Sequence, residues 1–119
     1  MAEAQPNDCI FCRIARGKLG TEFVAESEHS VAFRDLHPQA PVHVLVVPKR
    51  HFAGLREVGD EDWHVTADAL ALAARVAAEQ GLYDGGYRVI TNDGPDAGQT
   101  VWHLHFHVLG GAKLQAGLG

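Results

Sequence analysis

Three histidines occupy alternate positions near the end of the chain, at His103, His105 and His107 in GQTVWHLHFHVLGG. Alternate residues of a strand point to one side, so we expect the three imidazoles to share a face. The opposite, core-facing side would then carry Thr100, Trp102, Leu104, Phe106 and Val108. The first and third imidazoles would lie about 13 Å apart on a straight strand, too far to share one metal ion. At least one imidazole is therefore available as a nucleophile or proton carrier near neutral pH.

The loop before these histidines, NDGPDAGQT at 92–100, has the composition of an anion site. Its glycines let backbone N–H groups approach a ligand, as in the concave turns that hold phosphate. Asn92, Gln99 and Thr100 add neutral hydrogen-bond donors. A nucleophilic imidazole beside such a loop predicts phosphoryl or nucleotidyl transfer.

Cys9 and Cys12 are the only cysteines and have the spacing C-x-x-C. A structural disulfide is not expected in a reducing compartment. The pair fits three interpretations: a redox pair, two inert packed thiols, or two ligands of a zinc ion.

The length of 119 residues indicates one domain, which we place at 9–119 after a flexible tail at 1–8. The net charge of −5, without a basic stripe, argues against nucleic acid as a partner. No apolar run approaches the length of a membrane span, and the first residues lack the pattern of a signal peptide. We therefore expect no membrane association and a cytoplasmic location.

Hydrophobic patterning predicts an α+β domain with a five-stranded antiparallel sheet and two helices. Strands are expected at 22–26, 30–36, 42–48, 87–92 and 100–109. The β-branched residues of 42–48 suggest a strand that is buried on both faces. A short helix is expected at 9–17 and a long one at 63–82, with Asp60 as N-cap and Gly81 as the stop signal.

The pattern N-x-G-x-x-x-G-Q-T-V-x-H-x-H-x-H-x-x-G-G, from Asn92 to Gly111, resembles the histidine triad (HIT) family. It is most similar to the HINT-type branch of nucleotide phosphoramidases. FRDLHPQAPVHVLVVPKRH at 33–51 resembles the nucleoside-binding segment of that family. The resemblance implies a homodimer in which the long helix and the strand at 87–92 meet their copies, so that one sheet continues across the two-fold axis.

The resemblance also implies catalytic roles. His105 would attack the α-phosphorus of a nucleotide, with its Nδ1–H held by the carbonyl of His103. His107 would contact phosphate oxygens near the leaving group, His43 would support proton movement, and Thr100 would supply a hydroxyl. For His43, the residues alone also allow an ordinary strand position.

The nucleotide contacts implied by the resemblance begin with Asp35, which would hold the ribose hydroxyls, and Leu36, which would line the base pocket. The residues alone also allow Asp35 to be a turn residue before His37. The complete implied set is Asp35, Leu36, Asn92, Gly98, Gln99, Thr100, Val101 and His107.

Some bacterial HIT proteins, and the related galactose-1-phosphate uridylyltransferases, complete a C-x-x-C zinc site with two histidines. The matching positions are His51 and His103, so the resemblance implies a closed structural zinc site of Cys9, Cys12, His51 and His103. Two other interpretations of the triad face stay open: a metalloenzyme that uses this face around an open zinc, or histidines that are simply solvated on a half-exposed strand.

The activity implied is hydrolysis of purine nucleoside phosphoramidates of the AMP–amine type through a nucleotidyl-histidine intermediate. The alternatives are a dinucleoside polyphosphate hydrolase and a nucleotide-binding module with little catalysis. The C-terminal GAKLQAGLG differs from the aromatic and proline segment of animal HINT proteins, so their specificity does not carry over.

Overall fold

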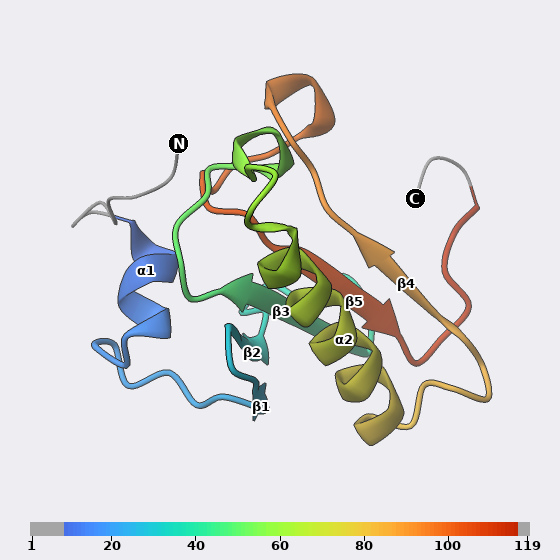
Figure 1. Ribbon diagram of the computed structural model, residues 1–119. Coiled ribbons are helices and arrows are strands. Elements are labelled where there is room, and N and C mark those ends of the chain that lie inside the picture. Colours follow the sequence, from blue (N-terminus) through green and yellow to red (C-terminus); the bar gives the residue numbers. More distant parts are fainter. Residues whose placement is uncertain (1–8, 117–119) are drawn as a thin grey trace.

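Five antiparallel strands form one sheet in the order β1-β2-β3-β5-β4 (Figure 1). The computed structural model describes residues 9–116, and the predicted tail at 1–8 lies outside the described residues. The strands are β1 (Ala25–Glu26), β2 (Ser30–Arg34), β3 (Val42–Pro48), β4 (Tyr87–Ile90) and β5 (Phe106–Gly110). The predicted α+β class with a five-stranded antiparallel sheet is confirmed.

A long helix, α2 (Trp63–Glu79), covers one face of the sheet (Figure 1). Its buried side chains recur at intervals of three and four residues, which is the spacing of one helical face. They are Val65, Thr66, Ala69, Leu72, Ala73, Val76 and Ala77. This face packs on Leu104, Phe106 and Val108, so these three residues belong to the main core, as predicted.

The short helix α1 (Ile10–Ala15) lies on the opposite face and closes a second, smaller core. Strand β3 divides its side chains between the two cores. Val44 and Val46 face the α2 side, whereas Leu45 and Val47 pack with Phe11 of α1. The predicted burial of β3 on both faces is confirmed, because a helix covers each side.

The predicted stop signal of the long helix is confirmed, but its predicted N-cap is not. Gly81 adopts φ 76°, which favours glycine, and its N–H bonds the carbonyl of Ala78. The prediction of Asp60 as N-cap is wrong, because the capping position belongs to Asp62. The Asp62 carboxylate makes no capping bond and instead accepts from Nη1 of Arg50 at 2.8 Å.

The predicted strand 100–109 is the main error. Only 106–110 is strand, and the chain bends through 101–103. The N–H of Leu104 bonds the carbonyl of Phe52 at 2.6 Å, outside the strand ladder. Thr100 and Trp102, expected in the core, are exposed because they precede the strand, and Trp102 is 51% exposed.

The strand predicted at 42–48 has the expected bounds, and the other predicted elements are shorter than expected. The strands predicted at 22–26, 30–36 and 87–92 are 25–26, 30–34 and 87–90. The helices predicted at 9–17 and 63–82 are 10–15 and 63–79. Local turns take over at these ends; for example, the Asp35 carboxylate accepts from the N–H of His37 at 2.8 Å.

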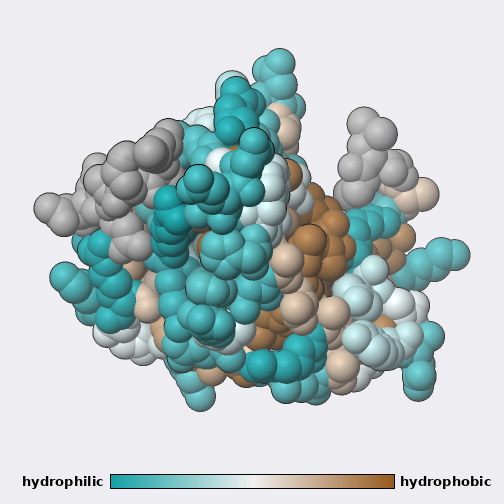
Figure 2. Space-filling model, in the orientation of Figure 1, coloured by the Kyte–Doolittle hydropathy of each residue, from teal (hydrophilic) through white to brown (hydrophobic). Residues whose placement is uncertain are grey.

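No helix within residues 9–116 is long and apolar enough to cross a membrane. The space-filling view shows mostly hydrophilic surface on the face drawn, with an apolar band between α2 and β4 (Figure 2).

Candidate active site and metal centre

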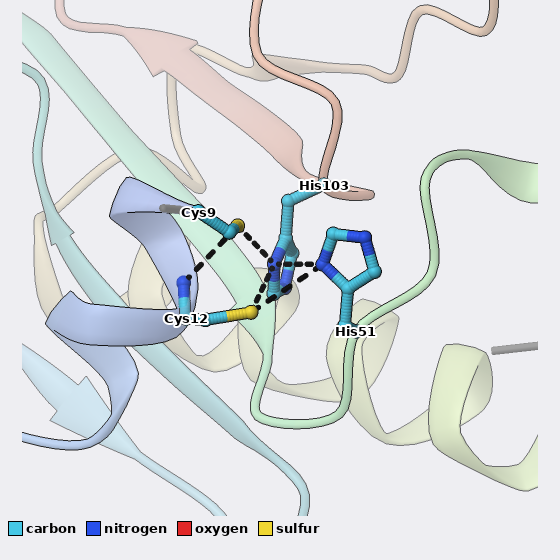
Figure 3. A group of neighbouring side chains, drawn as sticks. All are labelled: Cys9, Cys12, His51 and His103. Carbon is cyan, nitrogen blue, oxygen red and sulfur yellow. Dashed lines mark hydrogen bonds between the residues drawn. The ribbon is translucent and has the colours of Figure 1, made fainter. Parts of the chain in front are cut away.

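Two cysteines and two histidines converge from three distant segments, as the resemblance implies (Figure 3). Cys9 and Cys12 stand at the start of α1, His51 follows β3, and His103 precedes β5. Their four ligand atoms all lie within 4.8 Å of one another. Nδ1 of His103 lies 3.3 Å from Sγ of Cys9, 3.4 Å from Sγ of Cys12 and 3.2 Å from Nδ1 of His51.

These separations suit a tetrahedral zinc ion. Nitrogen and sulfur atoms bound to zinc at 2.0–2.3 Å would stand about 3.3–3.8 Å apart. The tautomer of His103 also fits, because its Nε2–H donates to the carbonyl of Pro48 at 2.8 Å. The lone pair of Nδ1 therefore faces the other three ligands. Such an orienting hydrogen bond on the second nitrogen is usual for metal-binding histidines.

Burial sets the protonation of this cluster. His103 is fully buried, and desolvation lowers its pKa to about 4, so the ring is neutral and able to ligate. Burial and the neighbouring Cys9 raise the pKa of the Cys12 thiol to about 12. Without a cation Cys12 is therefore a thiol, and a zinc ion would have to displace its proton.

One ring nitrogen of His105 is held by a hydrogen bond to the backbone. Nδ1 of His105 lies 2.7 Å from the carbonyl oxygen of His103, which can only accept. Nδ1 therefore carries the proton, and Nε2 carries the lone pair. The hydroxyl of Thr91 donates to the carbonyl of His105 at 2.7 Å and fixes the main chain there.

The surroundings of His105 keep its ring neutral. The ring of Phe11 packs edge-on against it, with 5.1 Å between centroids and 84° between planes. Desolvation lowers the pKa of His105, opposed by its bond to His103 and by the charge of Asp35. A neutral imidazole with an available lone pair is the form that attacks an electrophile.

His43 and His107 form a second, separate pair beside His105. The N–H of Gln39 donates to Nδ1 of His43 at 3.0 Å, so the His43 proton is on Nε2. Nε2 of His43 lies 2.9 Å from Nδ1 of His107, which must accept. The proton of His107 is therefore on Nε2. Desolvation and the neighbouring His105 and His43 lower the pKa of His107 to about 4.

Asp35 is the turn residue that the sequence allowed, and its proposed role in holding the ribose stays a prediction. One carboxylate oxygen accepts from the N–H of His37 in a tight turn, and the other lies 3.4 Å from Nε2 of His43. The turn therefore orients the carboxylate toward the histidine pair.

A cleft of about 360 Å³ joins these residues to an apolar wall. Of the predicted site residues, it is lined by Asp35, Leu36, Thr100, Val101, His105 and His107. Sequence reasoning missed the remaining lining residues, which are Ile10, Phe11, Ile14, Thr21, Phe33, Arg34, His37 and Leu45. The only signal for the apolar ones was their periodicity in α1, β2 and β3, which also suits ordinary core residues.

Other predicted residues build the loop beside the cleft. Asn92, Gly98 and Gln99 are not among the described residues that line it. Gly98 turns the chain at φ 87°, a conformation that favours glycine. Gln99 is buried, and its donors bond other residues of the protein. Its side-chain Nε2 donates to the carbonyls of Ala53 and Val101, and its backbone N–H donates to the carbonyl of Gly94.

Comparison with known proteins settles the family. The HIT domain family matches residues 16–114, which is most of the chain. This chain belongs to the HIT family. An uncharacterised HIT-like protein of Synechococcus elongatus is 45% identical over 107 residues, covering 90% of this chain and 93% of that protein.

Two solved HIT structures share the whole fold. A histidine triad protein from Clostridium difficile has a TM-score of 0.91 and 42% identity, covering 95% of this chain and 98% of that chain. A HIT family hydrolase from Legionella pneumophila has a TM-score of 0.89 and 40% identity, covering 94% and 100%.

Three histidines of this HIT protein lie outside both clusters. The rings of His29 and His64 pack edge-on against each other, with 5.2 Å between centroids. His37 is exposed at the edge of the cleft that contains His105.

Proposed function

We propose that this HIT protein hydrolyses purine nucleoside phosphoramidates of the AMP–amine type, with His105 as the nucleophile. The observation that carries the proposal is the hydrogen bond from Nδ1 of His105 to the carbonyl of His103, because it leaves a lone pair on Nε2. His105 lines a cleft whose apolar wall would accept a base. The Legionella relative, named a HIT family hydrolase, supports the same class of reaction.

The cleft offers a suitable environment for each part of a nucleotide. Phe11, Phe33 and Leu36 provide apolar surface for the base. The carboxylate of Asp35 would accept hydrogen bonds from the ribose hydroxyls. Thr100 and Nε2–H of His107 would donate to the phosphate oxygens. With these contacts, the phosphorus would lie between the loop and the imidazole of His105.

The proposed reaction has two balanced steps. In the first, the Nε2 lone pair of His105 forms a bond to the α-phosphorus while the P–N bond of the substrate breaks. One proton enters from solvent, so that the nitrogen leaves as a neutral amine. In the second step water attacks the same phosphorus, the P–Nε2 bond breaks, and one proton returns to solvent. The products are the amine and the nucleoside monophosphate.

The fit of Cys9, Cys12, His51 and His103 leads us to include a structural zinc ion in the proposal. Four protein ligands would close its coordination sphere, so it would bind no substrate and supply no Lewis-acid step. Its effect on the reaction would be mechanical: it would tie α1, which carries Phe11, to His103, which holds His105.

Rapid chemical quench with a nucleotide labelled at the α-phosphorus tests the function. A nucleotidyl adduct should appear on His105 of the wild type during turnover of an AMP–lysine conjugate. His105→Ala should show no adduct and lose turnover by about a thousandfold or more, while still binding AMP. Turnover that survives this substitution would exclude His105 as nucleophile. Binding of AMP without turnover of any conjugate would indicate a nucleotide-binding module, and faster cleavage of a diadenosine polyphosphate would redefine the substrate.

We also propose a homodimer formed by α2 and β4. Strand β4 is at the edge of the sheet, and its Tyr87 and Val89 are 37% and 38% exposed. The apolar band between α2 and β4 adjoins this edge (Figure 2). Sedimentation should show a dimer that Val89→Glu dissociates. Leu19→Glu, which alters a comparably exposed residue after α1, should remain dimeric.

A further inference from the structure

Trp102 is a large apolar side chain that neither core uses. It stands between Val101 and the buried His103, yet 51% of it is exposed. A second cavity of about 410 Å³ begins at this indole. Its walls are Cys9, Ile10, His51, Ala53, Thr100, Val101 and Trp102.

The second cavity adjoins the cleft that contains His105. Ile10, Thr100 and Val101 line both hollows, so the two are separated by one stretch of backbone and one side chain of α1. Thr100 is the residue at which we place the phosphate. A substrate whose nucleoside fills the first cleft can therefore extend past Thr100. Its leaving group, on the other side of the phosphorus, would then enter the second cavity.

The walls of the second cavity define the chemistry of its occupant. Among the residues that the structure describes, those lining it include no carboxylate, lysine or arginine, so none of these lining residues would form an ion pair with a charged group. The indole of Trp102 provides a flat apolar surface. His51 directs Nδ1 at the cysteine and histidine cluster, and its second ring nitrogen lies on the far side of the ring (Figure 3). The cavity therefore suits an uncharged aromatic group.

We propose that this second cavity is the leaving-group subsite and that Trp102 determines specificity by stacking on an aromatic amine. The inference rests on the proposed function and adds the class of leaving group. Both an aromatic and a small amine would leave the same nucleotidyl-His105 behind. A difference in rate between the two conjugates therefore reports on the step in which the amine is still attached.

The test compares two AMP conjugates whose amines differ only in a phenyl ring, phenethylamine and ethylamine. The wild type should show a kcat/KM about fivefold higher for the phenethylamine conjugate, the size of an aromatic pair contribution. Trp102→Ala should bring this ratio close to one, and Trp102→Phe should keep most of it. Trp63→Ala is the matched control, because Trp63 is 46% exposed on α2 and lines neither hollow.

The outcomes separate the two proposals. Equal kcat/KM for the two conjugates in the wild type, or a preference that Trp102→Ala leaves intact, would overturn the subsite and leave the nucleotide hydrolase standing. Failure to hydrolyse either conjugate would overturn the proposed function and the subsite with it. Because Trp102 adjoins a cluster residue, zinc content is measured in every variant. A ratio that falls to one in Trp102→Ala and persists in Trp102→Phe, at equal zinc content, supports the subsite.

Discussion

The carbonyl oxygen of His103 holds Nδ1 of His105 at 2.7 Å, while the ring of His103 belongs to the cluster of two cysteines and two histidines. One residue therefore serves both centres, with its side chain in one and its main chain in the other. The ring and the carbonyl of His103 belong to the same residue. A change that loosens the ring should therefore also move the carbonyl, and with it the imidazole of His105.

Substitution of a cysteine tests this connection. The wild type should contain one zinc per chain, and Cys9→Ser should lose it, because a hydroxyl replaces a thiolate ligand. Loss of a ligand that binds only the folded state should lower Tm by about 10 °C. Turnover should fall as well. Metal analysis by mass spectrometry and thermal denaturation measure these effects; zinc that persists without the cysteine would favour an open site on the triad face.

The substitution Asp35→Asn distinguishes the effect of the negative charge of Asp35 from the effect of the turn that its side chain stabilises. Asparagine keeps an oxygen that can accept from the N–H of His37, so the turn should persist. The loss of a charged acceptor for the ribose hydroxyls should raise KM about tenfold for a ribonucleoside conjugate. KM for the corresponding dideoxynucleoside conjugate should change little, because that substrate lacks the hydroxyls. Equal effects on both substrates would remove Asp35 from ribose recognition.

The lowered histidine pKa values predict the pH dependence. Burial holds the pKa of His105 below 6.5, so kcat/KM should stay level above neutral pH and fall only with an acid midpoint below 6.5. The free energy of unfolding should also decrease at acid pH. The pKa of His107 is 6.5 in the unfolded chain and about 4 when folded, so protonation favours unfolding. The stabilisation by neutral His107 is present above pH 6.5 and is lost as the pH falls toward 4.

Urea denaturation at pH 7 and pH 5 measures the stability effect. The free energy of unfolding should drop between these two values in the wild type and drop less in His107→Gln, which has no proton to gain. Zinc content is measured at each pH so that loss of metal is separated from protonation. An acid midpoint of kcat/KM above 6.5 would contradict the neutral-imidazole interpretation.

Gln99→Ala should destabilise the fold. The buried Gln99 side chain accepts from the N–H of Gly94 and donates to the carbonyls of Ala53 and Val101. Its removal leaves buried backbone groups without partners, which should cost about 2 kcal/mol in chemical denaturation. Gln39→Ala is the control, because that exposed amide bonds only a neighbouring carbonyl, and its stability should be unchanged. An equal loss in both variants would contradict this role of Gln99.

Sequence reasoning succeeded where local periodicity and tertiary environment agree. The β-branched residues of β3 indicated burial on both faces, and Gly81 marked the end of α2, because each feature acts within a few residues. It failed at 100–105, because there the local alternation and the tertiary contacts disagree. The alternation through His103 and Leu104 continues that of β5, yet Leu104 bonds the carbonyl of Phe52 instead of a strand neighbour. Trp102 lies in the resulting bend and is exposed. The local sequence pattern does not predict this bend.

The sequence by itself determined the order of the elements, the family pattern and the types of residue available for chemistry, because these depend on neighbours along the chain. The tertiary structure alone decided that Cys9 and His103, 94 residues apart, share one cluster, and that Phe11 packs on His105. It also decided the proton positions of His43, His103 and His105, because each takes its tautomer from a carbonyl or amide that folding brings beside it. His107 takes its tautomer from the neighbouring His43.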